Sequence, residues 1–186
     1  MKILLVNNHT AHLKSLETSL AGHEIEVLEY RPGVKFNHED KDLVILSGGG
    51  GEGLEIYDLH QSSRRLWYQD EMEFVLKNDK PLIGICMGFE VICAAYGQKI
   101  YETSVLTQGY KSIIPTLKGQ KQISKAALTQ FESHYWQVHT APKGFEVLAE
   151  SETGIEIIKK DNIFATQFHP EKDGTLSLRQ LVHQTA

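Results

Sequence analysis

Cysteines and long apolar runs are scarce in this sequence, and each scarcity excludes a class of protein. Of the 186 residues, only Cys86 and Cys93 are cysteines, which is too few for a disulfide framework. No Cys or His pairs recur at the spacing of zinc ligands. We therefore expect a reduced, cytoplasmic protein that needs no metal and no cofactor.

Features that would indicate a membrane or a nucleic-acid partner are also missing. No stretch of 18 apolar residues occurs, so the sequence predicts no transmembrane helix. The apolar run at residues 3–6 has four residues, too few for a secretory signal, and it indicates a buried first strand. The formal net charge of −5 gives no basis for a nucleic-acid or anionic-membrane partner.

The pattern along the chain predicts one α/β domain over residues 1–186. Apolar runs typical of strands alternate with helical patterns in the first half, as in an open, mostly parallel sheet with helices on both faces. After Gly97 short β-like runs predominate, which indicates antiparallel additions to the same sheet. The predicted strands are 2–7, 25–30, 42–47, 81–85, 99–107, 110–116, 146–149, 156–159 and 163–168, and the predicted helices are 10–20, 66–77, 88–96 and 176–183.

The sequence Gly84-Ile85-Cys86-Met87-Gly88 lies where a predicted strand meets a predicted helix. This is the spacing of a nucleophile elbow, in which small residues two before and two after the nucleophile relieve crowding in a sharp turn. The positive end of the following helix is expected to favour the thiolate. A free cysteine is otherwise most often a small buried apolar residue, and Cys86 taken alone leaves that alternative open.

A base and its orienting acid are predicted at the end of the last apolar run, where His169, Pro170 and Glu171 follow Phe168. Because proline cannot donate to a strand ladder, the strand must end near His169. Glu171 can then accept a hydrogen bond from the imidazole, which fixes its tautomer and stabilises its cation. Taken alone, a histidine before proline is more often an ordinary residue at a strand end.

Four glycines follow the strand predicted at residues 42–47, at positions 48–51. Glycines after a strand permit close approach of the backbone to a ligand, so one of their N–H groups, with that of Met87, is a candidate oxyanion donor. A flexible turn is the alternative. The sequence lacks the lysine pattern of a P-loop.

Three features in one order resemble the class I glutamine amidotransferase family: Ser-Gly-Gly at 47–49, Gly-Ile-Cys-Met-Gly at 84–88 and Gln-Phe-His-Pro-Glu at 167–171. The segments 132–138 and 142–149 look most like the glutaminase subunit of the GMP synthetase branch. The resemblance implies a flavodoxin-like sheet and hydrolysis of L-glutamine through a γ-glutamyl thioester on Cys86. It also implies ammonia delivery to a separate synthase or ATP-pyrophosphatase subunit.

The resemblance further implies roles for individual residues. Gly49 and Met87 would be the oxyanion donors, and the backbone near Ser133, His134 and Tyr135 would hold the α-amino and carboxylate groups of glutamine.

The sequence departs from the family pattern at three places. Glu90 stands where the family usually has a substrate-binding Gln, Gly50 stands where Pro is frequent, and residues 6–9 replace a common Asp-x-Gly-x-Gln stretch. Glu90 favours one alternative, a self-sufficient γ-glutamyl hydrolase. Glu90 and Gly50 together leave a second, a non-catalytic binding or regulatory module. Residues 53–68 are either a lid or docking surface or, as we favour, an ordinary loop and helix start.

Overall fold

The computed structural model describes residues 1–49 and 67–185. Its described strands form one sheet in the order β2-β1-β3-β4-β9-β8-β7-β5-β6. The strands are β1 (Lys2–Asn8), β2 (Glu24–Glu29), β3 (Leu43–Gly49), β4 (Leu82–Ile85), β5 (Tyr101–Pro115), β6 (Leu128–Gln137), β7 (Glu146–Glu150), β8 (Ile155–Lys160) and β9 (Ile163–Thr166). The helices are α1 (Leu13–Ser19), α2 (Gln69–Lys77), α3 (Met87–Ala95), α4 (Leu117–Gln122) and α5 (Leu178–Thr185).

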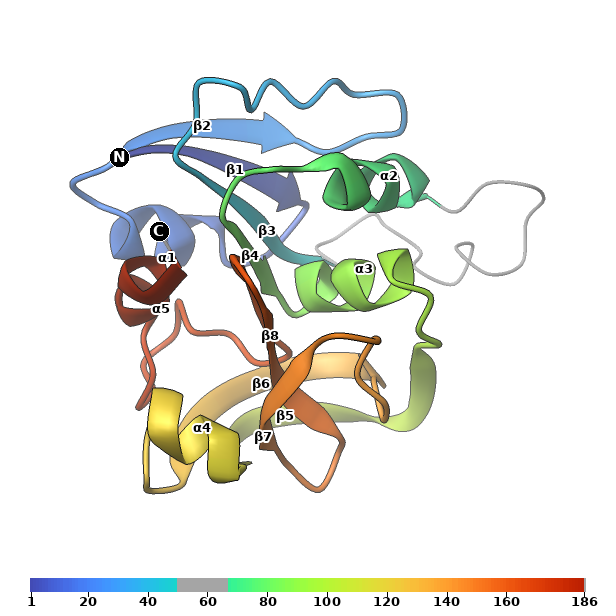
Figure 1. Cartoon of the computed structure of the whole chain (residues 1–186), viewed down its shortest axis with the longest axis vertical. Coiled ribbons are helices and arrows are strands. Elements are labelled where there is room, and N and C mark those ends of the chain that lie inside the picture. Colours follow the sequence, from blue (N-terminus) through green and yellow to red (C-terminus); the bar gives the residue numbers. More distant parts are fainter. Residues whose placement is uncertain (50–66, 186) are drawn as a thin grey trace.

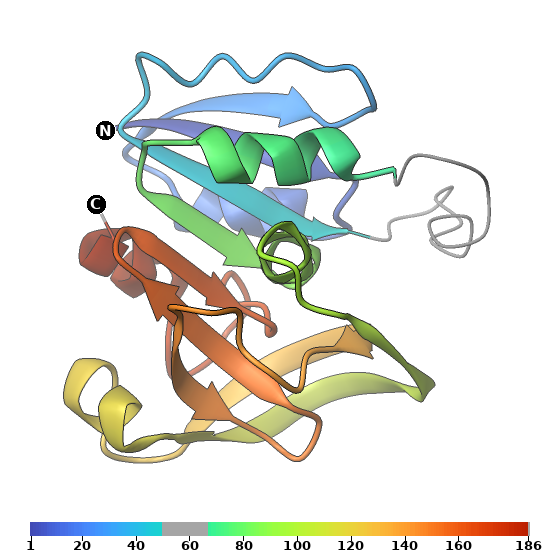
Figure 2. The same ribbon diagram turned by 45° about the vertical axis from the view of Figure 1, so that its right-hand side comes forward.

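The five strands from β2 to β9 in this order are parallel. Their central members are buried on both faces, as their continuous apolar runs require. One apolar core contains Leu16 of α1 and Leu181 of α5, and the other contains Phe74 of α2 and Phe89 of α3. The two helix pairs therefore cover opposite faces of the sheet (Figures 1 and 2). This confirms the predicted mixed α/β sheet with helices on both faces.

The antiparallel part begins at β8, which pairs with β9, and continues through β7 to the β5–β6 ribbon. This ribbon lies at the lower end of the molecule in Figure 1. Strand β6 also reaches the end of β9, because the N–H of His169 donates to the carbonyl oxygen of Phe131 at 2.9 Å. The ribbon thus brings β6 to the edge where the parallel strands end.

The structure differs in detail from several expectations from the sequence. The runs at 99–107 and 110–116 are one strand, β5, which passes through Gly109 with a φ of 98°. Neither β6 nor α4 was predicted. Helix α1 begins at Leu13 rather than residue 10. Helix α2 begins at Gln69, and residue 66, where it was expected to start, lies outside the described residues.

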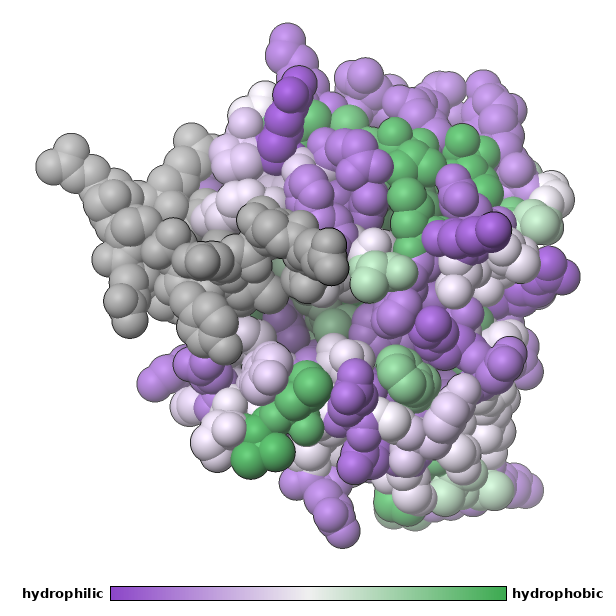
Figure 3. Space-filling view, turned by 180° about the vertical axis from the view of Figure 1, so that it is seen from behind, coloured by the Kyte–Doolittle hydropathy of each residue, from purple (hydrophilic) through white to green (hydrophobic). Residues whose placement is uncertain are grey.

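The described helices and one face of the surface show how apolar residues are distributed outside the core. Among the described residues, none of the helices combines the length and the hydrophobicity needed to span a membrane. On the described part of the face in Figure 3, apolar residues occur in separate groups divided by polar side chains. Scattered exposed apolar residues are normal and need no partner to account for them.

Candidate functional site

Cys86 occupies the sharp turn between β4 and α3. Its φ of 50° and ψ of −104° are unusual for a residue with a side chain, and such backbone strain is concentrated at functional sites. The N–H of Cys86 donates to the carbonyl oxygen of Thr166 at 2.8 Å. Gly84 and Gly88 flank the turn so closely that a methyl group on Gly84 would meet the Gly88 backbone at 2.8 Å. The elbow predicted from the sequence is therefore present.

His169 and Glu171 are paired just beyond the end of β9. Nδ1 of His169 lies 2.8 Å from Oε1 of Glu171, and both side chains are nearly or completely buried. The other ring nitrogen, Nε2, has no hydrogen-bond partner among residues 1–49 and 67–185. If Glu171 is ionised, Nδ1 carries the proton and Nε2 is left as an acceptor.

The elbow and the histidine lie together because β4 and β9 are neighbouring parallel strands, with Ile85 beside Thr166. Parallel strands end at the same edge, where ligands of open α/β sheets bind. A methyl group placed on Gly48 would lie 3.0 Å from Cε1 of His169 and 3.5 Å from Cβ of Cys86. Cysteine and imidazole thus flank one small space next to Gly48, which a side chain on that residue would fill.

The backbone of Gly48 and Gly49 is held by a buried polar network. The hydroxyl of Ser47 donates to the Gly48 carbonyl at 2.7 Å and accepts from the Asn8 N–H at 2.8 Å. The Asn8 amide donates to Glu71 Oε1 at 3.0 Å. A methyl group on Gly49 would overlap Sδ of Met87, so the two expected oxyanion residues are in close contact. Gly50 and Gly51, also part of that expectation, lie outside the described residues.

The pKa of the Cys86 thiol corrects one expectation. Burial raises it well above its usual range, and the charges of Glu90 and Glu171 add to the increase, while a hydrogen bond from the Met87 N–H lowers it. The helix N-terminus therefore does not outweigh desolvation. A raised pKa favours the thiol over the thiolate.

Glu90 lies on the first turn of α3 and is 9% exposed. Its Oε1 accepts a hydrogen bond from the Gln167 amide at 2.9 Å. Burial raises the pKa of Glu90 to about 7, against the lowering effect of that hydrogen bond. Gln167 directly follows the strand that leads to His169, so Glu90 is linked to the same edge of the sheet as Cys86.

Three consecutive residues of β6 were expected to hold glutamine, and only part of this segment faces Cys86. The carbonyl oxygen of Ser133 lies 3.9 Å from the Cys86 sulfur. The side chain of His134 is buried and contacts Glu132, with Nε2 3.2 Å from Oε2. Tyr135 is 41% exposed. The backbone at Ser133 is therefore the part of the expected segment that contacts the Cys86 sulfur.

His12 was missed by reasoning from the sequence. Its ring packs edge-on against His169 with the ring centroids 4.9 Å apart. Its pKa is lowered by burial first, then by the charges of His169 and Lys172. His12 follows β1, and the carboxyl end of β1 lies at the same edge of the sheet as those of β4 and β9. Its position after the first strand was the one feature of the sequence that could have indicated a place near His169.

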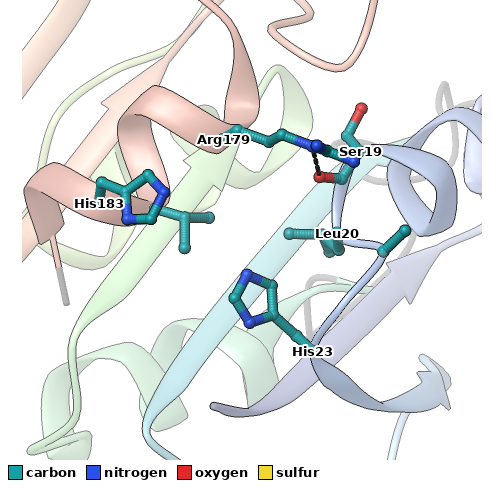
Figure 4. A pocket seen from close by; sticks show the side chains of 7 residues that line it. Ser19, Leu20, His23, Arg179 and His183 are labelled. Atoms are coloured by element: carbon teal, nitrogen blue, oxygen red, sulfur yellow. Dashed lines mark hydrogen bonds between the residues drawn. The ribbon is translucent and has the colours of Figure 1, made fainter.

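A hollow between α1 and α5, shown in Figure 4, shares none of its lining residues with this site. It is lined by residues that include His23, Arg179 and His183. The Arg179 guanidinium donates from Nε to the Ser19 carbonyl at 2.9 Å and from Nη2 to the Thr18 carbonyl at 3.4 Å. These carbonyls lie at the C-terminal end of α1, where a cation is favourable, so Arg179 stabilises a helix end.

Comparisons with known proteins agree with this arrangement. The family model described as "Glutamine amidotransferase class-I" matches residues 4–185. A GMP synthase [glutamine-hydrolyzing] subunit of Sulfurisphaera tokodaii is 29% identical over 139 residues, covering 72% of this chain and 69% of that protein. The subunit of the same name from Methanococcus maripaludis is 35% identical over 106 residues, covering 54% of this chain and 55% of the relative. The match thus spans little more than half of the second relative.

Solved structures show the same fold at lower sequence identity. A glutamine amidotransferase from Thermotoga maritima superposes with a TM-score of 0.71 at 18% identity, covering 92% of this chain and 76% of that one. A structure from Thermoplasma acidophilum, described as that of a candidate GMP synthase subunit, gives a TM-score of 0.78 at 20% identity. It covers 100% of this chain and 92% of the other.

Proposed function

Because this chain belongs to the class I glutamine amidotransferase family, with the family model matching residues 4–185, we propose that it hydrolyses L-glutamine to glutamate and ammonia. The observation that carries the proposal is the convergence of Cys86 and the His169–Glu171 pair on the space beside Gly48. A thiol, a base and an orienting acid in this arrangement have the parts needed for nucleophilic attack on a carboxamide.

In the first half of the proposed reaction, the Cys86 sulfur attacks the γ-carboxamide carbon of glutamine. Nε2 of His169 takes the thiol proton, and Glu171 stabilises the resulting imidazolium through Nδ1–H. The unpartnered Nε2 and the raised thiol pKa support this assignment, since the thiol needs a nearby acceptor. His169 then returns the proton to the leaving nitrogen, the C–N bond breaks, and ammonia departs from a γ-glutamyl thioester.

In the second half, water attacks the thioester while His169 acts as base, and glutamate leaves with the thiol restored. The oxyanion formed in each half needs donors that are fixed in advance. We assign this role to the N–H groups of Met87 and Gly49. The close packing of Gly49 on Met87 and the anchoring of Gly48 by Ser47 support it.

The ammonia is proposed to pass to a separate synthase subunit of the ATP-pyrophosphatase type. The relatives from Sulfurisphaera tokodaii and Methanococcus maripaludis are both named as one subunit of GMP synthase [glutamine-hydrolyzing], a name that assigns them to a larger enzyme. GMP synthesis is accordingly the proposed destination of the ammonia.

Hydrolysis of γ-glutamyl peptides is the second candidate function, and Glu90 is the observation that favours it. A buried carboxyl group with a pKa of about 7 replaces the neutral amide usual in glutaminases. This group is linked through Gln167 to the edge that carries Cys86, so it can alter which γ-substituent is accepted.

A covalent probe tests the proposed chemistry independently of any partner. A glutamine analogue with an electrophilic diazoketone at the γ position should form one adduct per chain, on Cys86. Cys93→Ala is the matched control and should label normally, because Cys93 lies in the core. An adduct on a residue other than Cys86, or no adduct after incubation with the probe, would contradict the proposal.

A further inference from the structure

The buried face of β6 carries polar side chains in place of an apolar row. Side chains alternate between the two faces of a strand, and the buried positions after Leu128 are Gln130, Glu132 and His134. Gln130 is satisfied, because its amide donates to the Leu176 carbonyl and its Oε1 accepts from the Leu176 N–H. Glu132 and His134 have no such pairing with the chain near Leu176.

Glu156 of β8 completes a cluster with these two residues. One ligand atom from each of Glu132, His134 and Glu156 lies within 4.8 Å of the others. All three residues are buried, with exposures of 0%, 5% and 1%. Two carboxyl groups and an imidazole in one water-excluded place are costly unless their charges are compensated.

The compensation within the described residues is incomplete. Oε1 of Glu132 and Oε2 of Glu156 are buried atoms that find no hydrogen-bond partner in the part of the chain that the structure describes. Native structures leave few such atoms unpaired, and a bound ion accounts for some of those that remain. We infer that Glu132, His134 and Glu156 form a binding site for one divalent transition-metal ion of the Zn²⁺ or Mn²⁺ class. This departs from the sequence-based expectation of no metal, which considered only Cys and His pairs.

The surrounding contacts are those that orient metal ligands. Nδ1 of His134 lies 2.7 Å from the Trp136 carbonyl, so Nε2, which lies 3.2 Å from Oε2 of Glu132, is the ligand atom that would turn to the ion. Oε1 of Glu156 accepts hydrogen bonds from Ser151 Oγ at 2.6 Å and Thr153 Oγ1 at 3.1 Å. Both hydroxyl residues are half-buried.

The donor set selects the class of ion. One imidazole nitrogen with carboxylate oxygens suits Zn²⁺ or Mn²⁺, whereas an all-oxygen set would suit Ca²⁺ or Mg²⁺. Ligand atoms around a tetrahedral zinc ion lie roughly 3.5 Å apart, and the three groups here lie within 4.8 Å of one another, so small side-chain movements would complete the site. Three protein ligands leave at least one coordination position for water.

The proposed ion site is separate from the catalytic thiol. The ligands come from the side chains of β6 and β8, whereas the Cys86 sulfur contacts the backbone of β6, at the Ser133 carbonyl. An ion would fix the strand that carries Ser133 and would neutralise Glu156, one of the charges that raise the pKa of Cys86. The assignment itself does not depend on the proposed glutaminase function.

Ion binding to the metal-stripped protein tests the site. Zn²⁺ and Mn²⁺ should each bind at one equivalent per chain in calorimetry and raise the midpoint of thermal unfolding, whereas Mg²⁺ should do neither. Glu132→Gln and Glu156→Gln should each weaken binding about 100-fold. Glu150→Gln, which changes an exposed carboxylate on the neighbouring strand β7, should bind as the unaltered protein does.

Two further measurements separate this site from metal capture by the catalytic thiol. Binding should persist in Cys86→Ala, and X-ray absorption of the unaltered protein with zinc should show nitrogen and oxygen ligands without sulfur. The absence of a stoichiometric ion, loss of the ion in Cys86→Ala, a sulfur shell, or unchanged affinity in both glutamate variants would each overturn the inference.

Discussion

His169 Nδ1 lies 2.8 Å from Glu171 Oε1, within a pair of side chains that are 4% and 0% exposed. The carboxyl group of Glu171 therefore orients the imidazole through Nδ1 and leaves Nε2 for the proposed reaction. Glu171→Gln should keep this orientation but weaken stabilisation of the imidazolium. We expect acylation to slow by about 10²- to 10⁴-fold, measured as the rate of a single glutamine turnover. An unchanged rate would mean that another group orients His169.

Replacing Glu90 by Gln tests the influence of a buried carboxyl group on the nucleophile. The charge of Glu90 is the second cause, after burial, of the raised pKa of Cys86. Glu90→Gln should therefore lower the thiol pKa, and Cys86 should react faster with iodoacetamide at a given pH. Cys86→Ala provides the blank. A pH profile identical to that of the unaltered protein would show that Glu90 does not act on the sulfur.

The same substitution should also change substrate preference. With an amide in place of Glu90, kcat/KM for glutamine relative to a γ-glutamyl peptide should rise about tenfold, the equivalent of roughly 1.4 kcal/mol. Steady-state kinetics on both substrates measure this ratio. A ratio that stays the same or falls would remove Glu90 from the determinants of specificity.

Gly88 is required by packing under the elbow. A methyl group at this position would overlap the Leu46 carbonyl oxygen and would lie 2.8 Å from Leu46 Cβ. Since the obstacle includes backbone, Gly88→Ala should lower the free energy of unfolding by about 2 kcal/mol or more. Urea denaturation measures this, with Ala95→Ser, a half-buried position at the end of the same helix, as control. Equal stability of both variants would contradict the packing argument.

Glu71 should make stability depend on pH. Its burial raises its pKa to about 8, from an unfolded value of 4.5. Between these values the folded state binds more protons than the unfolded state, so stability falls as pH rises through this window. Relative to the unaltered protein, Glu71→Gln should gain on the order of 3 kcal/mol between pH 5 and pH 8. Urea denaturation at pH 5 and pH 8 measures this gain. If the difference in free energy of unfolding between the two proteins is the same at both pH values, the raised pKa of Glu71 is contradicted.

The parallel half of the fold was predictable because its strands are continuous apolar runs. The elbow and His169–Glu171 were predictable because local sequence determines where each lies at a strand end. In contrast, β6 escaped notice because its buried face carries Gln130, Glu132 and His134. These polar side chains are buried against β8 and the segment near Leu176. Both lie far from β6 in the sequence, so a local pattern does not predict the burial.

Other parts of the site depend on tertiary contacts that no local pattern encodes. His12 lies against His169 because β1 and β9 end at one edge, although the two histidines are far apart in the chain. The anchoring of Gly48 joins Asn8, Ser47 and Glu71 from three elements. The thiol pKa was predicted in the wrong direction, because helix-end charge can be inferred from sequence but the extent of burial cannot.

The central claim is that Cys86 hydrolyses glutamine, and the most direct test is glutamate release by the purified chain beside Cys86→Ala. We predict release that disappears in the variant while its thermal unfolding stays cooperative, because one sulfur atom contributes little packing. Release that survives in Cys86→Ala, or no release from glutamine even when a synthase subunit is supplied, would contradict this claim.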